Sequence, residues 1–592
     1  MFRQKQAVSL VDWKNDNSSG KSLSALLPSI SSILAQYRTS TIPVSTQRSW
    51  VLGKTKADPG ISEEFSTAIF TALSLALPYL EDLFIYASDF RGRSTRVLDV
   101  EQLATLVREE GLDGFLYVEL SRGEGEGLIV TLHIHGEELS EWTISVHDDE
   151  LSASLVGRLV LDASTVLQGS PPKLANEMIE YLDSRNLVSL HKYWLSFKFA
   201  AANDYANVKK ICLEAIQHDP QFLEAYRALA TAYQYLGRID DSRDAMSKAI
   251  STHSLESPRN AVMARALYYA FYNQDYEKAS KELEEMLKLS PLDESAINNL
   301  AVSYFYLLDF ARAKELSLRD LELYPMKTLG RQNSAFYSLY AGDLEEADAL
   351  AEDVLMDDKA YYNSFMIRAL VSAQKGDYLD AKNGYKLGMG ISEQSDSVML
   401  QGMADLSIAL NELNAAEQLL SRGIEIDRKL ENREYLARKM LMQAEIAVRK
   451  NSNTGIHSIV EKALETSSSV ATLASAIILS IFCGADPTPS IERMLKQKVN
   501  IHSRAYLKLL HGFQLCLEQN YGEGISLLDE AIETLDMWLI RLGRAYIFRS
   551  GGLLLETQDE LSVCKARYGE SLSATMDEQP TFRYFRLVQD EN

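Results

Sequence analysis

The chain has 592 residues, with 60 Lys and Arg against 83 Asp and Glu, and a formal net charge of -23. Apolar residues make up 46% and charged residues 24%, which is usual for a folded globular protein and excludes wholesale disorder. The acidic balance disfavours nucleic acid as the main partner and also an anionic membrane surface, because both are bound through clustered Lys and Arg.

The four cysteines are isolated from one another, and none belongs to a CxxC pair. We therefore expect neither a disulfide framework nor a zinc site. The first residues, MFRQKQAVSLVDW, lack an apolar core of signal-peptide length. No apolar stretch reaches the roughly 18 residues that a membrane-spanning helix needs. These observations predict a soluble, cytoplasmic protein.

The predicted elements begin with an extension, residues 1–45, that contains one amphipathic helix near 23–37. Residues 46–168 then mix strand and helix periods. The expected elements are strands at 50–53 and 83–87, helices at 62–77 and 100–109, three consecutive strands within 115–147, and a closing helix at 151–166. The order β-α-β-α-β-β-β-α predicts a small α/β domain.

Three segments of this domain resemble the TolB-like, or FlgO-like, amino-terminal domain of bacterial signalling proteins: GISEEFSTAIFTAL (60–73), VLDVEQLATLVREEGLDGFLYVEL (97–120) and EWTISV (141–146). In that family the domain often precedes helical repeats and follows a kinase, cyclase or winged-helix module. Two features depart from the family. The first strand reads SWVLGKT instead of an apolar run ending in Pro-Phe, and only about 45 residues precede the domain.

A helical linker is expected at 169–190, and internal repeats follow it. Ala279, Ala313, Ala347 and Ala381 recur at one constant spacing, and an Asp precedes each Ala by one helical turn. The resulting 34-residue period is the signature of a stacked repeat architecture.

Each repeat is predicted to be a pair of amphipathic helices. In the repeat at 294–327, Ile297, Leu300 and Tyr304 fall at i, i+3 and i+7 on one helical face. The repeated Ala leaves room for the two helices to cross closely. Pro325 then ends the second helix.

The pattern of aromatic, Leu, small residue, Tyr, Ala and Pro resembles the tetratricopeptide repeat (TPR) family over residues 191–425. The repeat at 223–256, for example, contains Tyr226, Leu229, Ala230, Tyr233 and Ala249. Residues 426–566 continue as degenerate helix pairs, and residues 567–592 are expected to cap the array. The predicted fold class is therefore mainly α: a TPR α-solenoid of about 9–11 helix pairs, preceded by a small α/β domain.

Two candidate chemical sites in the α/β domain were weighed against simpler interpretations. The run RGEGEG (122–127) joins two strands, so a hairpin turn is favoured over a phosphate cradle, which must open a helix. His133 and His135 share a strand face, but the expected register puts His147 opposite about Ile129, too far for a shared metal. A solvent-facing or domain-facing polar sheet is the favoured alternative.

No nucleophile elbow, HExxH sequence or phosphate loop is present. We therefore expect no enzyme activity, no catalytic residue, no metal and no cofactor.

The TPR resemblance implies that the first helix of each repeat lines a concave groove, with positions 2, 5, 9, 12 and 13 facing it. These positions carry an aromatic ladder with polar side chains along its edge. The candidate partner-binding residues are Arg227, Tyr235, Tyr268, Phe271, Tyr272, Asn298, Phe305, Tyr306, Gln332, Phe336 and Tyr340. Exposed aromatic side chains and amides suit a peptide ligand, whereas packing between adjacent repeats is the alternative interpretation.

The leading hypothesis is thus a non-enzymatic interaction scaffold or adaptor that binds a protein or peptide segment in the groove. The alternative is a regulatory or sensory component of a bacterial signalling or transcription-control system that acts on a separate output protein. The sequence leaves open the partner, the pathway, the oligomeric state and any small ligand of the α/β domain.

Overall fold

The structure is a computed structural model. It describes residues 48–53, 55–76, 83–87, 100–110, 113–122, 128–136, 142–146, 153–168, 175–183, 185–201, 204–236, 238–252, 258–289, 291–323, 328–357, 359–450, 456–467, 500–573 and 580–584, with single residues and pairs within 452–495. The expected helix at 23–37, the glycine run at 123–127 and His147 lie outside these residues. Within the described ranges, no helix is long and apolar enough to cross a membrane.

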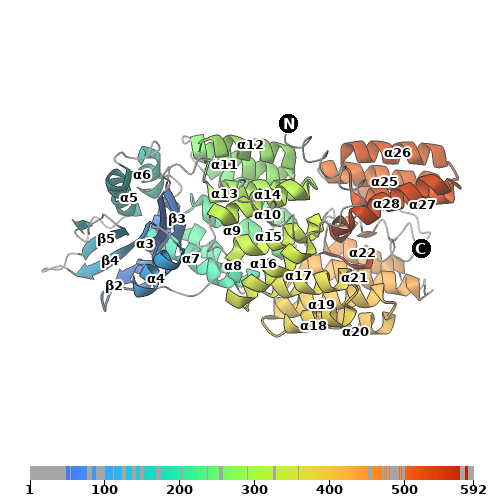
Figure 1. The fold of residues 1–592 in the computed structure, drawn as a ribbon, viewed down its shortest axis with the longest axis horizontal. Coiled ribbons are helices and arrows are strands. Elements are labelled where there is room, and N and C mark those ends of the chain that lie inside the picture. Colours follow the sequence, from blue (N-terminus) through green and yellow to red (C-terminus); the bar gives the residue numbers. More distant parts are fainter. Residues whose placement is uncertain are drawn as a thin grey trace, which may run out of the picture. The chain divides into compact units, whose positions relative to one another are not determined.

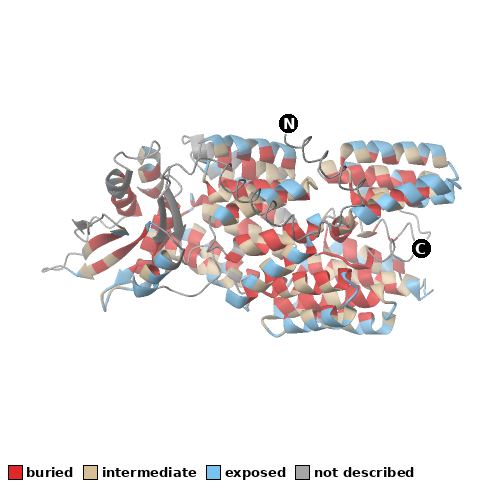
Figure 2. Ribbon diagram, in the orientation of Figure 1, coloured by how far each residue is buried: buried red, intermediate tan, exposed pale blue. Residues whose placement is uncertain are grey.

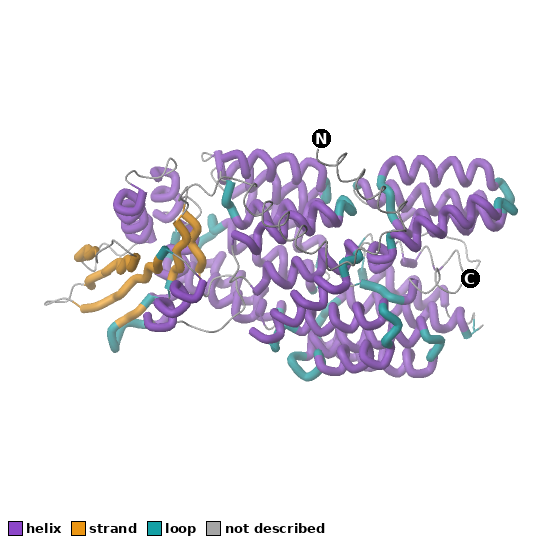
Figure 3. The backbone as a smooth tube through the Cα atoms, viewed as in Figure 1, coloured by secondary structure: helices purple, strands orange, loops and turns teal. Residues whose placement is uncertain are grey.

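The α/β domain contains one sheet, and its elements follow the predicted order apart from one additional two-residue strand (Figures 1 and 3). Its strands are β1 (Arg48–Leu52), β2 (Lys56–Ala57), β3 (Leu83–Ala87), β4 (Gly114–Arg122), β5 (Leu128–Gly136) and β6 (Trp142–Val146). The strand order is β3-β1-β4-β5-β6, with β2 paired to β4. β1 runs parallel to β4, whereas β4–β5 and β5–β6 are antiparallel.

The register of β5 and β6 differs from the predicted one. Ile129 lies opposite Ser145, and Leu132 lies opposite Trp142. The predicted pairing of Ile129 with His147 was therefore wrong by two residues, because Trp142 pairs with Leu132, farther from the connection between the two strands than we expected.

Helix α3 (Glu63–Ala76) joins the sheet to the helical array. Every residue of α3 from Ser66 onward is buried. One apolar core contains strand residues such as Val118, α3 residues such as Ile69, and Trp194 of α7 (Leu187–Ala201). The Oγ1 atom of Thr67 on α3 lies 2.5 Å from Nδ1 of His191 on α7. The α/β domain and the first array helix thus share a continuous core.

The remaining helices of the α/β domain are α4 (Val100–Glu110) and α5 (Ala153–Gln168), and α6 (Ala175–Asp183) precedes the array. The array itself, within the described residues, contains ten helix pairs, in agreement with the predicted mainly α solenoid. The pairs are α7/α8 (Tyr205–His218), α9 (Leu223–Tyr235)/α10 (Ile239–Thr252), α11 (Pro258–Leu267) with η4 (Tyr268–Asn273)/α12 (Tyr276–Leu289), α13 (Glu294–Tyr306)/α14 (Phe310–Leu323), α15 (Thr328–Ala341)/α16 (Leu344–Asp357), α17 (Tyr362–Gln374)/α18 (Tyr378–Leu387), α19 (Glu393–Ala409)/α20 (Leu413–Lys429), α21 (Arg433–Arg449)/α22 (Ile456–Thr466), α25 (Ile501–Leu517)/α26 (Tyr521–Thr534) and α27 (Trp538–Ser550)/α28 (Leu554–Ala566).

A left-handed residue at each turn shows the 34-residue period in the backbone itself. Gln274, Leu308, Gly342 and Gly376 have φ angles of 51°, 63°, 87° and 89°. Each turn ends the first helix of a pair, and the next residue is the repeated Asp. The left-handed conformation costs a side chain such as that of Leu308 more than it costs glycine, so repeat packing enforces the turn there.

The repeated Asp and Ala open the second helix of each pair. The backbone N–H of Ala313 donates to the carbonyl of Asp309 at 3.0 Å, and Ala347 bonds Asp343 in the same way. Ala279, Ala313, Ala347 and Ala381 are all fully buried. This burial confirms that the alanines lie where two helices cross closely. Figure 2 shows the buried residues along the inner faces of the pairs and the exposed ones on their outer surfaces.

The later helices return to contact the earlier repeats. The backbone N–H of Arg433 on α21 donates to the carbonyl of Leu236 at 3.2 Å. Asn500, which caps α25, donates through Nδ2 to Oε1 of Gln274 at 2.7 Å. His502 donates through Nε2 to the carbonyl of Tyr306 at 2.6 Å. These bonds close the concave side of the array over its middle repeats.

Candidate functional site

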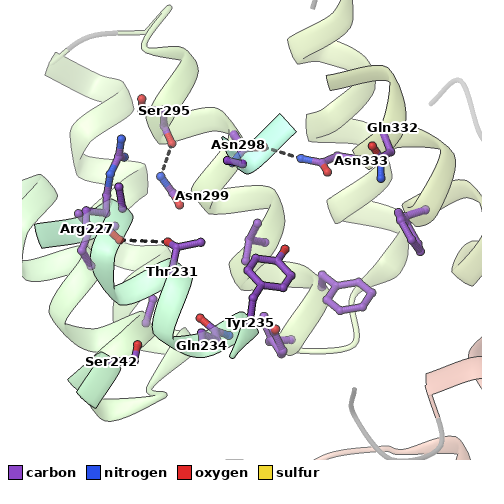
Figure 4. A pocket seen from close by; sticks show the side chains of 18 of the residues that line it. Arg227, Thr231, Gln234, Tyr235, Ser242, Ser295, Asn298, Asn299, Gln332 and Asn333 are labelled. Carbon is purple, nitrogen blue, oxygen red and sulfur yellow. Dashed lines mark hydrogen bonds between the residues drawn. The ribbon is translucent and has the colours of Figure 1, made fainter. Parts of the chain in front are cut away.

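A cavity of about 480 Å³ lies on the inner side of the array, in the size range of ligand-binding pockets. Its lining comes mainly from the first helices of six consecutive pairs, namely α7, α9, α11 with η4, α13, α15 and α17. Tyr435 of α21 contributes from a later pair. Figure 4 shows the wall that α9, α13 and α15 form, with their side chains converging on the cavity.

Eight of the eleven predicted partner-binding residues line this cavity. They are Arg227, Tyr235, Asn298, Phe305, Tyr306, Gln332, Phe336 and Tyr340. Tyr268 is not among the lining residues, and it packs edge-on against Tyr269 with ring centroids 5.7 Å apart. The side chains of Phe271 and Tyr272 lie outside the described part of the chain.

A π-helical turn begins at Tyr268. Residues Tyr268–Asn273 form η4, a wider turn that interrupts the α-helical register from which the groove positions were predicted. Ala270 and Gln274 reach the cavity from this stretch instead. The strict 34-residue register used in the sequence analysis does not allow for such a turn.

The tyrosines at the ends of the first helices also pack between repeats. Tyr235 stacks on Tyr205 with ring centroids 4.2 Å apart, and Tyr306 stacks on Tyr276 at 4.5 Å. Tyr340 stacks on Phe310 at 5.4 Å, and only 1% of it is exposed. Each stack joins the same two repeat positions in adjacent pairs. The packing interpretation of the aromatic ladder is therefore supported, and Tyr235, Tyr306 and Tyr340 line the cavity as well.

Side-chain amides give the cavity its polar character. Asn333 donates through Nδ2 to Oδ1 of Asn298 at 2.9 Å, and Asn299 donates to the carbonyl of Ser295 at 2.7 Å (Figure 4). Gln332 is 4% exposed, and its Oε1 atom has no hydrogen-bond partner. A buried carbonyl oxygen without a partner is costly, so Gln332 is suited to accept a hydrogen bond from a ligand.

Charge is scarce around the cavity. Among the described residues that line it, only Arg227 and Glu294 carry charge. Burial opposes the charge of Arg227, but Tyr193 and Glu224 outweigh burial and raise the pKa of the guanidinium. A single half-buried cation cannot supply the set of phosphate contacts that a nucleic acid needs.

Several lining residues were not predicted from the sequence. Asn299 and Asn333 occupy the same position in consecutive repeats, so the repeat pattern could have identified them. Tyr205 and Tyr276 begin second helices, whereas the sequence analysis sought groove residues only on first helices. Tyr435 gave no sequence signal, because it reaches the cavity only through closure of the array.

The described histidines and cysteines that the sequence analysis considered have other contacts. Oε2 of Glu119 lies 2.8 Å from Nε2 of His133, whose ring stacks on Tyr117. Among the described residues, no cluster of His, Cys, Asp and Glu could hold a metal. Cys212 and Cys564 are buried, and burial raises the pKa of each thiol to about 12. These thiols are therefore not nucleophiles at neutral pH.

No protein-family model and no curated protein matches the chain. Solved structures that are similar to it include yeast Tom70, at 14% identity and a TM-score of 0.37, covering 69% of this chain and 92% of that one. The pilus biogenesis factor PilW has 19% identity and a TM-score of 0.27, covering 36% and 99%. Human IFIT1 crystallised with PPP-AAAA has 12% identity and a TM-score of 0.35, covering 64% and 90%.

These similarities are low, so the repeat architecture of this chain rests on its own 34-residue period and helix pairs. The resemblance of residues 46–168 to the TolB-like domain stays a prediction, because only the order of its elements is confirmed.

Proposed function

We propose that the chain is a non-enzymatic binding protein whose TPR-like array holds a segment of a partner protein in the aromatic and amide-lined cavity. The observation that carries this proposal is Gln332, whose buried carbonyl oxygen faces a lining of aromatic rings and amides without a hydrogen-bond partner. Backbone N–H groups of an extended peptide would supply such a partner, and the aromatic rings would cover its apolar side chains. The cytoplasm is the proposed location.

A protein segment is favoured over RNA because the lining is neutral. Phosphate groups require several Lys or Arg side chains, and Arg227 alone does not provide them. Stacking on aromatic side chains does occur in single-stranded nucleic acid recognition, so RNA binding is an informative outcome of the same test.

The test compares two variants with the same chemical change. Gln332→Met removes the unpartnered carbonyl and keeps the side-chain volume. Gln374→Met makes the same change in the next repeat, where the amide is also buried and without partners but does not line the cavity. Both changes should raise the free energy of unfolding by about 1 kcal/mol, because each removes an unsatisfied buried group.

Ligand binding should separate the two variants. The full chain is used to probe an array of synthetic peptides and a set of RNA oligonucleotides, and affinities for the ligands found are measured by fluorescence anisotropy. Gln332→Met should weaken peptide binding about tenfold, the worth of one hydrogen bond, and Gln374→Met should leave it unchanged. Equal affinities in both variants, or binding of RNA alone, would refute the proposal.

A further inference from the structure

The chain's own residues 580–584 occupy the concave side of the array beyond the cavity. Phe582 is fully buried, in one apolar core with Tyr362 and Met366 of α17. Its ring lies 6.2 Å from that of Tyr378 on α18, centroid to centroid. Tyr584 packs farther along, against Trp538 and Cys564. A short segment from the end of the chain is thus embedded among helices that come much earlier in the sequence.

Two acidic side chains hold this segment through its backbone and its arginine. Oδ2 of Asp405 on α19 accepts the backbone N–H of Phe582 at 2.5 Å and that of Arg583 at 3.2 Å. Oδ1 of Asp405 accepts the Arg583 guanidinium at 2.5 Å. Glu445 on α21 accepts Nε of Arg583 at 2.8 Å. We call Asp405 and Glu445, with the apolar surface under Phe582, the acidic socket.

The acidic socket has charged groups that are not needed merely to shield the apolar end of the array from water. Asp405 is 3% exposed and the side chain of Arg583 is 7% exposed, so both charges are nearly removed from water. Such a pair is favourable only when each partner is present in the right geometry. An apolar segment would bury the same surface without requiring a charged partner for Asp405. The socket therefore distinguishes arginine from other residues.

The same contacts have the form of peptide recognition. Backbone N–H groups are fixed by a carboxylate, an aromatic ring fills an apolar site, and a guanidinium is bound by two carboxylates. The socket also borders the cavity, because Met366 lines both the cavity and the small pocket beside Thr581 and Arg583.

We propose that the acidic socket is a second recognition site, selective for an aromatic residue followed by arginine, which residues 580–584 occupy in cis and from which a partner segment of the same chemistry displaces them. This inference goes beyond the proposed function, since the socket, which meets the cavity at α17 through Tyr362 and Met366, uses different chemistry. A tethered segment acts at an effective concentration in the millimolar range, so the intact chain resists weak competitors.

The experiment uses the full chain and a fluorescent peptide with the sequence of residues 578–587, EQPTFRYFRL. Arg583→Ala should weaken the cis contact, so the peptide should bind this variant at least about tenfold more tightly than the natural chain. A peptide with Gln in place of its first arginine should lose that binding. Adding Asp405→Asn to the Arg583→Ala chain should abolish it as well. Equal binding to the natural and Arg583→Ala chains would overturn the proposal.

A second form of the chain covers the case in which Arg583→Ala fails to fold. A protease recognition sequence replaces residues 574–579 of the otherwise natural chain, which is then cut after folding. Native mass spectrometry should show the released C-terminal segment bound at first and then exchanged for the added peptide, with the helical circular dichroism unchanged. If the segment does not exchange over a day, or if cutting unfolds the array, residues 580–584 are part of the core and the proposal fails.

Discussion

Two regions of the array's inner surface differ in what fills them. On α9, α13 and α15 the inner positions are aromatic and amide side chains around a cavity of about 480 Å³. On α17, α19 and α21 the chain fills the equivalent space with its own Phe582 and Arg583. The aromatic ladder also ends there, because the position of Tyr340 is taken by Gln374 in the next repeat. The same repeat thus yields a hollow neutral region and a filled charged one.

This difference shows that a repeat pattern defines positions and leaves their use open. In the first region, an inner side chain has a hydrogen-bond acceptor without a partner, namely the carbonyl oxygen of Gln332. In the second region, the carboxylate of Asp405 instead binds the chain's own C-terminal segment, through three hydrogen bonds to Phe582 and Arg583. An external segment is therefore expected to bind the first region directly, and to bind the second only after it displaces residues 580–584.

The largest expected effect on stability distinguishes a buried ring of the aromatic ladder, Tyr340, from a half-buried one, Phe336. Tyr340 is 1% exposed and packs on Phe305 and Phe310, so Tyr340→Ala should lower the free energy of unfolding by about 4 kcal/mol. Phe336 is half-buried in the cavity wall, so Phe336→Ala should lower the free energy of unfolding by only about 1 kcal/mol. It should weaken peptide binding more than Tyr340→Ala does. Urea unfolding and anisotropy measure the two quantities. Equal destabilisation by both changes would remove the distinction.

The next largest effect on stability is expected at Gly569, which packs on the end of α15 just before the C-terminal segment. A Cβ atom on Gly569 would lie 2.6 Å from both the backbone nitrogen of Gly342 and the carbonyl oxygen of Tyr340. Backbone atoms cannot move aside easily, so Gly569→Ala should lower the free energy of unfolding by about 3 kcal/mol.

Gly522→Ala is the matched control, because a Cβ atom there meets nothing within 4 Å. It should be neutral or slightly stabilising in the same helical array. Limited proteolysis should then cut the C-terminal segment of Gly569→Ala faster than that of Gly522→Ala. Identical melting and cleavage of the two chains would show that η5 (Tyr568–Ser573) is not docked as described.

A smaller effect is expected from pH, through the closure of the array. Burial lowers the pKa of His502 from 6.5 to about 4, so the folded chain holds this ring neutral. Stability from this group is present above pH 6.5 and is lost as the pH falls toward 4, since the unfolded chain binds the proton more readily. From pH 7 to pH 5 the free energy of unfolding should fall by about 2 kcal/mol through His502 alone.

His502→Gln keeps a donor for the carbonyl of Tyr306 and removes the titration. The pH dependence of unfolding should therefore be flatter in this variant than in the natural chain, by the same amount. An unchanged slope would mean that His502 is not buried against Tyr306 in solution.

Much of the fold could be predicted from the sequence because its signals are local. The spacing of Ala279, Ala313 and Ala347 fixed the repeat, and strand and helix periods fixed the order of elements in the α/β domain. The register of β5 and β6 could not be fixed in this way, because the pairing of two strands depends on contacts across the sheet.

The candidate site was less predictable, since part of it depends on long-range closure. Arg227, Asn298 and Gln332 followed from their repeat positions. The π-helical turn that begins at Tyr268 breaks the repeat register, and no signal in the 34-residue pattern marks it. Docking of Arg583 on Asp405 joins two residues far apart in the sequence, and no periodic signal predicts such a pair.

The most direct test of the central claim is crosslinking from inside the cavity. A photoreactive phenylalanine analogue is placed at Phe336 in the full chain, with Leu379, which is 74% exposed on α18, as the matched position outside it. After irradiation in native extract, adducts are analysed by mass spectrometry following protease or nuclease treatment. We predict protease-sensitive adducts with a defined protein segment at position 336 and none of these at 379. Nuclease-sensitive adducts, or the same adducts at both positions, would contradict a cavity that binds a protein segment.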